Sequence, residues 1–172
     1  MFKYQQFILT INLVIKLVEV GNRMAMLRHD NDLKQKDVAK ILNVKENTYS
    51  KWEKCSNDIP LEKINVLANF YNVNLDYLLG ISNKIEHSEN LKINYQKICE
   101  RLLELRKENH LTQNKLSDKI GFFQTTYSSF ETGVRRPTTY KLLYIVNFYN
   151  ASIDYVVGRT NIKKTYISKT TK

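Results

Sequence analysis

The side chains best suited to recognise a ligand fall into two groups, one in each half of the chain, with the same spacing. Each group begins with a glutamine, Gln35 or Gln113, and continues with short amides, hydroxyls and cations. Amides and hydroxyls can exchange hydrogen bonds with the edges of DNA bases, and Asn and Gln pair especially well with adenine. The candidate contact residues are Gln35, Lys45, Glu46, Asn47, Ser50, Lys51 and Lys54 in the first group, and Gln113, Phe123, Gln124, Thr125, Ser128, Ser129, Arg135 and Arg136 in the second.

Catalytic and metal-binding chemistry finds little support in the sequence. It has no Ser/His/Asp or Cys/His grouping, no phosphate-cradling glycine loop and no close pair of carboxylates. The two cysteines, Cys55 and Cys99, do not form a disulfide framework, and no paired Cys or His spacing predicts zinc. We therefore expect no enzyme activity, no metal and no cofactor. Free thiols fit a reducing cytoplasm.

The composition is that of a globular, helical and basic protein. Of the 172 residues 42% are hydrophobic and only 5 are Gly and 2 Pro, so the chain has few compulsory turns and favours helix. The formal net charge is +10. A positive balance attracts nucleic acids or anionic membrane surfaces, but it does not choose between them.

An internal repeat sets the architecture. At an offset of 78 residues without a gap, 17 of the 57 positions from Met24 to Gly80 are identical to those from Leu102 to Gly158. Self-similarity at a single offset indicates two copies of one structural unit. Two copies of this length predict two domains.

Within each copy the apolar spacing is helical. We predict helices over residues 23–31, 35–42 and 46–54, a fourth helix that carries Leu61 and Tyr71, and a short fifth one from Asn74 to Gly80, with the same five in the second copy. The first helix of that copy spans 94–109. Asn43 and Gly121 separate the second and third helices, where a tight turn needs a residue with positive φ. Thr48, Tyr49 and Trp52, with their counterparts, are expected to face inward.

This arrangement has the shape of a helix-turn-helix, and the chain resembles the lambda repressor-like, or Xre/Cro, family of regulators. The resemblance covers residues 23–82 and 95–160. The residues that carry it in both copies are the Leu-Arg pairs 27–28 and 105–106, Gln35 and Gln113, the Thr-Tyr-Ser triplets 48–50 and 126–128, Glu53 and Glu131, and the closing Asp-Tyr pairs 76–77 and 154–155. It implies an all-α fold with two tandem five-helix lambda repressor-like domains.

The resemblance also implies a function. It predicts a sequence-specific, double-stranded DNA-binding transcriptional regulator, most often a repressor, that inserts the third helix of each domain in the major groove. The glutamines would bridge a phosphate to the groove. Arg28 with Glu53, and Arg106 with Glu131, match buried ion pairs of the family that orient the first helix against the third.

The two copies differ in ways that favour the second as the stronger DNA binder. Its loop after the third helix carries Arg135 and Arg136, where the first copy has Ser56-Asn57-Asp58. Cys55 replaces Gly133 at a helix end that calls for positive φ. Glu46 could accept from a cytosine amino group but repels phosphate, and Phe123 could contact a thymine methyl or fill a gap. We expect an asymmetric bipartite DNA site.

We predict the domain boundaries 22–82 and 94–160, a polar linker over 83–93 and a mobile basic tail over 161–172. Residues 1–21 form an apolar N-terminal arm, whose apolar run Phe7–Val20 is interrupted by polar residues and is too short to span a membrane. They could be an added helix or strand, a partner-binding arm or translated upstream sequence, with Met24 as the natural start.

Other partners stay open at this stage. The main alternative is an antitoxin or co-regulator that binds a protein through its first domain or its N-terminal arm. A homodimer fits the resembled family, although tandem domains can cover two half-sites without one. A membrane-surface role rests only on the apolar segment and the basic tail, and we expect no membrane partner.

Overall fold

The computed structural model describes residues 2–87 and 90–164, with side chains from Ile15 onward, and is all-helical over the described residues. It confirms the predicted fold class. The chain divides into two compact units, one formed mainly by residues 12–91 and the other mainly by 92–137 and 141–164. We call them the first and second domains and describe each by itself.

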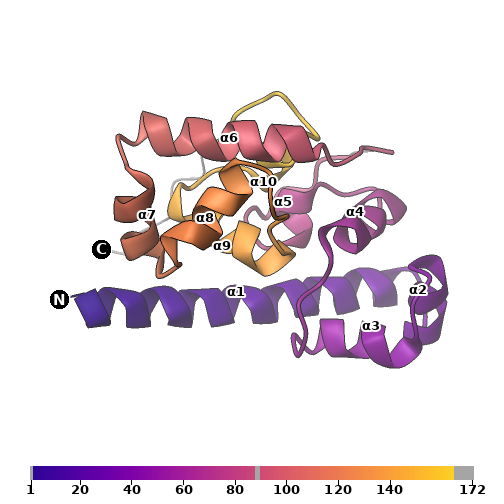
Figure 1. Cartoon of the computed structure of the whole chain (residues 1–172). Coiled ribbons are helices and arrows are strands. Elements are labelled where there is room, and N and C mark those ends of the chain that lie inside the picture. The colour runs from indigo at the N-terminus through magenta and orange to yellow at the C-terminus, as the bar shows by residue number, and fades with distance from the viewer. Residues whose placement is uncertain (1, 88–89, 165–172) are drawn as a thin grey trace. The chain divides into compact units, whose positions relative to one another are not determined.

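Among the described residues, five helices belong to each half of the sequence (Figure 1). In chain order they are α1 Phe2–Asp30, α2 Gln35–Ile41, α3 Glu46–Glu53, α4 Leu61–Phe70, α5 Leu75–Leu78, α6 Tyr95–Glu108, α7 Gln113–Ile120, α8 Gln124–Glu131, α9 Thr139–Phe148 and α10 Ile153–Val156.

The start of the first helix was predicted wrongly. Helix α1 begins at Phe2, whereas the repeat suggested a start at Arg23. No proline interrupts residues 2–30, and Val20, Met24 and Leu27 follow one another at helical spacing and are buried. Residues 12–21 of the apolar N-terminal segment are therefore part of the first domain.

The repeat is a repeat of the core. Val20, Met24, Val38 and Leu42 are buried in the first domain, and the residues 78 positions later are buried in the second. As predicted, Tyr49, Trp52, Tyr127 and Phe130 are also buried, so one face of α3 and of α8 packs inward. Thr48 and Thr126, expected to face inward, are only half-buried.

The turns that connect the second and third helices have the predicted backbone. Asn43 and Gly121 have φ values of 49° and 68°. At the next such position, after α3 and α8, Cys55 has a φ of 55° and Gly133 one of 74°. Cys55 thus keeps the left-handed conformation of its glycine counterpart despite its side chain.

The Cys55 side chain fits at this position because glycine and cysteine are exchanged between the first helix and the end of the third helix in the two domains. In the first domain Gly21 of α1 faces Cys55, whose thiol donates to the Leu17 carbonyl oxygen at 2.7 Å. In the second domain the counterpart of Gly21 is Cys99, which faces Gly133. In each domain one cysteine sulfur therefore lies between the first helix and the end of the third helix. The sulfur belongs to a residue just after the third helix in the first domain (Cys55) and to the first helix in the second domain (Cys99). Burial raises the pKa of both thiols, so both stay protonated at neutral pH.

We predict that Gly21→Ala destabilises the first domain by about 1–3 kcal/mol, because overpacking a filled site costs this much. A Cβ atom at position 21 would lie 2.2 Å from the Glu53 carbonyl oxygen and 2.8 Å from the Cys55 sulfur. Urea unfolding followed by the fluorescence of Trp52, the single tryptophan, measures the effect. Asn22→Ala, at an exposed neighbouring position, is the control. Equal stability of G21A and N22A would contradict the predicted clash.

In each domain a buried arginine on the first helix bonds to the residues at the end of the domain. Arg23 donates to the Tyr77 carbonyl oxygen, and to the Ser82 carbonyl and Asn83 side-chain oxygens at 2.6 Å. Arg101 makes the same three bonds, to Tyr155, Thr160 and Asn161. Each guanidinium also lies over the ring of the same tyrosine, at 4.6 Å and 4.1 Å from the centroid.

Contacts of both domains reach residues just outside the ranges 22–82 and 94–160. Val20 and Asn83 make contacts of the first domain outside residues 22–82, and Asn161 makes one of the second outside 94–160. The start of the predicted mobile tail is held in place, since Lys163 pairs with Glu104 and Glu108. The rest of the predicted tail, residues 165–172, lies outside the described residues.

Candidate functional site

The candidate contact residues lie around the second and third helix of each domain. In the first domain Glu46, Asn47 and Lys51 are exposed on α3, and Tyr49 and Trp52 are buried on its other face. Lys45, just before this helix, and Lys54, just after it, are also exposed, and Ser50 is half-buried. The helix thus presents a row of polar and cationic side chains to solvent.

Helix α8 has the same two faces but no exposed charge of its own. Thr125 is exposed, Gln124 and Ser128 are half-buried, and Tyr127 and Phe130 are buried behind them. The Ser129 hydroxyl donates to the Thr126 carbonyl oxygen at 2.7 Å, so its hydrogen is already used. Lys51 occupies the position of Ser129 in the first domain and is exposed.

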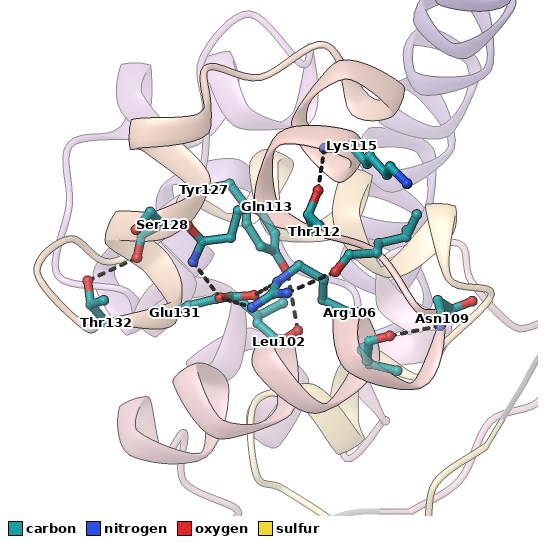
Figure 2. Close-up of polar contacts among 12 residues, drawn as sticks. Leu102, Arg106, Asn109, Thr112, Gln113, Lys115, Tyr127, Ser128, Glu131 and Thr132 are labelled. Carbon is teal, nitrogen blue, oxygen red and sulfur yellow. Dashed lines mark hydrogen bonds and ion pairs between the residues drawn. The ribbon is translucent and has the colours of Figure 1, made fainter.

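An arginine–glutamate pair ties the first helix to the third in each domain. Arg28 Nε lies 2.7 Å from Glu53 Oε1, and Arg106 Nε lies 2.6 Å from Glu131 Oε1. The glutamate side chains are only 6% and 4% exposed. Since the second guanidinium nitrogen also bonds each carboxylate, the pairs are bidentate, which fixes their orientation as well as their distance. Figure 2 shows the pair of the second domain.

The same carboxylates hold the two candidate glutamines. Gln35 Nε2 donates to Glu53 Oε2 at 2.7 Å, and Gln113 Nε2 donates to Glu131 Oε2 at 2.8 Å (Figure 2). Burial opposes ionisation of Glu53, but the hydrogen bonds from Arg28 and Gln35 outweigh it and lower the pKa of this carboxyl. Gln35 is thus fixed at the start of its helix by a buried ionised group.

One hydrogen bond distinguishes the two domains. Gln124 Nε2 donates to Gln113 Oε1 at 2.7 Å, which joins the first residue of α8 to the first residue of α7. The residue at the position of Gln124 in the first domain is Glu46, whose ionised carboxylate has no hydrogen to donate. This contact was not predicted from the sequence, although the difference between Gln124 and Glu46 at equivalent positions is a signal for it.

Phe123 precedes α8 and is 83% exposed. The interpretation that its ring fills a gap is therefore wrong. A large apolar side chain exposed beside the polar row of α8 adds an apolar surface to this part of the second domain.

The loop after α8 carries the two predicted arginines in different situations. Arg135 is exposed. The Arg136 guanidinium lies over the Tyr95 ring at 3.9 Å from its centroid, which limits its movement. The side chains at the same positions in the first domain, Asn57 and Asp58, are exposed and carry no positive charge.

Neither a metal site nor a membrane-spanning helix is found among the described residues. No group of three or more His, Cys, Asp or Glu side chains among them could hold a metal ion. None of their helices combines the length and apolar character that a membrane crossing needs.

Comparison with known proteins gives consistent matches. A model of a helix-turn-helix family, HTH_3, matches residues 24–78 and again 102–156. Over 63 residues the chain is 36% identical to YobD, an uncharacterized HTH-type transcriptional regulator of Bacillus subtilis, a match that covers 37% of this chain and 56% of that protein. It is 32% identical over 66 residues to the HTH-type transcriptional regulator AnsR of the same bacterium, covering 38% and 57%.

A further relative is the cryptic phage CTXphi transcriptional repressor RstR of Vibrio cholerae. It is 40% identical over 63 residues, which are 37% of this chain and 56% of that protein. The chain thus spans about half the length of the curated relatives it matches. No solved structure matches it significantly.

Proposed function

The chain belongs to the helix-turn-helix family HTH_3, which matches both of its halves, and on this premise we propose that it is a sequence-specific DNA-binding transcriptional regulator. Helices α3 and α8 would enter the major groove of double-stranded DNA, and the outcome would be repression. The observation that carries the proposal is the two-faced third helix of each domain, polar outside and locked from behind by a buried ion pair. The relatives are transcriptional regulators and one is a repressor.

The exposed side chains divide into two kinds of contact. Amides and hydroxyls at the start of each third helix would meet base edges, and cations would meet phosphates. The base-contacting set is Gln35, Glu46, Asn47 and Ser50 in the first domain, and Gln113, Gln124, Thr125, Ser128 and Ser129 in the second. The phosphate-contacting set is Lys45, Lys51, Lys54, Arg135 and Arg136. Phe123 would pack on a thymine methyl group.

Selection of bound sequences from a random pool of duplex DNA tests this function with the full chain. Two different third helices on one chain should enrich an asymmetric motif with two parts. One short motif would mean that a single domain binds DNA. No enrichment would contradict the proposal and favour an antitoxin or co-regulator that binds a protein. Chromatography with light scattering shows whether a homodimer forms, and we propose a cytoplasmic location.

We propose that the second domain contributes most of the phosphate contacts, and predict that Arg135→Ala with Arg136→Ala weakens binding to all DNA sequences. The slope of log affinity against log salt concentration is negative, and the loss of two phosphate contacts should reduce its magnitude by about 2. Fluorescence anisotropy at several salt concentrations measures this. Val134→Ala, an exposed neighbour without charge, is the control. An unchanged slope in the double variant would rule out the role of these arginines.

A further inference from the structure

The two domains present different hydrogen-bonding groups at one equivalent position. In the second domain the Gln113 carbonyl oxygen is satisfied by Gln124 Nε2 at 2.7 Å. Gln124 still has one N–H and its own carbonyl oxygen, so it offers a donor and an acceptor side by side.

At the position equivalent to Gln124, the first domain offers an acceptor alone. Gln35 Nε2 is already bound to Glu53 Oε2 at 2.7 Å, which orients this amide as in the second domain. Glu46 begins α3 as Gln124 begins α8. Its carboxylate cannot donate to Gln35 Oε1, so the bond that joins Gln124 to Gln113 has no equivalent between these two residues, and both oxygens can accept from a base.

From this we infer that the first domain selects cytosine through Glu46 and Gln35, an inference that rests on the proposed function. In the major groove cytosine presents its N4 amino group as a donor and has no acceptor on its own edge. Thymine O4 and the guanine N7 and O6 atoms are acceptors, which a carboxylate repels. Adenine has an N6 donor, but its N7 acceptor lies beside it and would be left facing a second acceptor. Cytosine is thus the base whose major-groove edge matches the Glu46 carboxylate.

The charges around Glu46 make this contact feasible. A carboxylate close to the phosphates of DNA is repelled by them, but Lys45 precedes Glu46 and Lys51 follows on the same helix, and both are exposed. Glu46 also lies in the first turn of α3, where a negative charge stabilises the helix terminus. A purely structural role predicts an effect on stability but none on base preference, so the experiment measures both.

The test compares selections from random duplex DNA by the full wild-type chain, by Glu46→Gln and by the reciprocal variant Gln124→Glu. We expect E46Q to change one motif position from cytosine to adenine, because a glutamine restores the pairing found in the second domain. Q124E should change a different position, in the other half of the motif, towards cytosine. The urea midpoint of E46Q, followed by Trp52 fluorescence, should stay close to that of the wild type.

A modified base then tests whether the cytosine N4 amino group makes the contact. N4-methylcytosine keeps its pairing with guanine but carries a methyl group in place of the major-groove hydrogen. At the identified position it should weaken wild-type binding by about five- to 100-fold, the range for a good base contact, and should affect E46Q much less. A motif that E46Q leaves unchanged at every position overturns this inference alone. No motif with the wild-type chain overturns the proposed function as well.

Discussion

Replacing Glu53 by alanine will destabilise the first domain by about 3–5 kcal/mol, the usual cost of removing one partner from a buried ion pair. The Arg28 guanidinium is buried and bonds both oxygens of Glu53. The variant leaves this buried charge with the Leu33 carbonyl oxygen at 3.0 Å and the His29 ring nitrogen Nε2 at 3.3 Å, neither of which carries a negative charge. Gln35 loses its acceptor too. Urea unfolding followed by Trp52 fluorescence reports on this domain, because Trp52 lies on α3 next to Glu53.

The double variant Arg28→Met with Glu53→Leu is the informative comparison. Replacing a buried pair by apolar residues of similar volume is often close to neutral, because desolvation of the two charges offsets their attraction. We therefore expect the double variant to be clearly more stable than Glu53→Ala. Equal losses in the two variants would mean that the site needs these side chains for their shape and not for their charge.

The pH dependence gives a second measure of the same pair. The pKa of Glu53 is lower in the folded domain than in the unfolded chain, where its ordinary value is 4.5. The unfolded state thus binds more protons, and the contribution of this group is complete above the unfolded pKa and is lost as the pH falls through the folded pKa. When the pH falls from 7 to below the folded pKa of Glu53, the free energy of unfolding should decrease more in the wild type than in Glu53→Gln. Parallel pH profiles would contradict the ionised pair.

Local pattern was enough to predict the helices, the inward face of the third helix and the turns before it. The buried Tyr49 and Trp52 follow from helical periodicity, and the turns at Asn43 and Gly121 follow from backbone sterics. Such features depend on neighbours within a few residues, which a sequence displays directly. The ion pairs became predictable because Arg28 and Glu53 recur at the same positions in both copies.

What could not be predicted depends on contacts between residues distant in the chain. Cys55 tolerates positive φ beside Gly21, which precedes it by more than thirty positions, and Arg136 stacks on Tyr95. The true extent of the first helix was missed because identity between the copies was followed only from Met24. Arg23 and its counterpart Arg101 are identical one position earlier, and their bonds to the end of each domain reveal that the repeat continues there.

A chain that begins at Met24 is therefore expected to lack a stable first domain. It would lose the buried Val20, the contact of Gly21 with Cys55, and the arginine that closes the domain through Tyr77, Ser82 and Asn83. Deleting a buried aliphatic side chain alone costs about 2–5 kcal/mol, comparable to half the stability of a small domain. We expect Trp52 fluorescence to show no cooperative unfolding transition in this variant.

Two full-length controls separate the causes. Arg23→Met removes the closing hydrogen bonds but keeps the helix, and should lower the urea midpoint without abolishing the transition. Arg101→Met is its matched counterpart in the second domain and should leave the Trp52 transition where it is, since the hydrogen bonds that Arg101 makes to described residues go to groups of its own domain. A Met24 chain as stable as the full chain would show that residues 2–23 are dispensable for the fold. In that case Met24 would again be acceptable as the natural start, which mass analysis of the native N-terminus can decide.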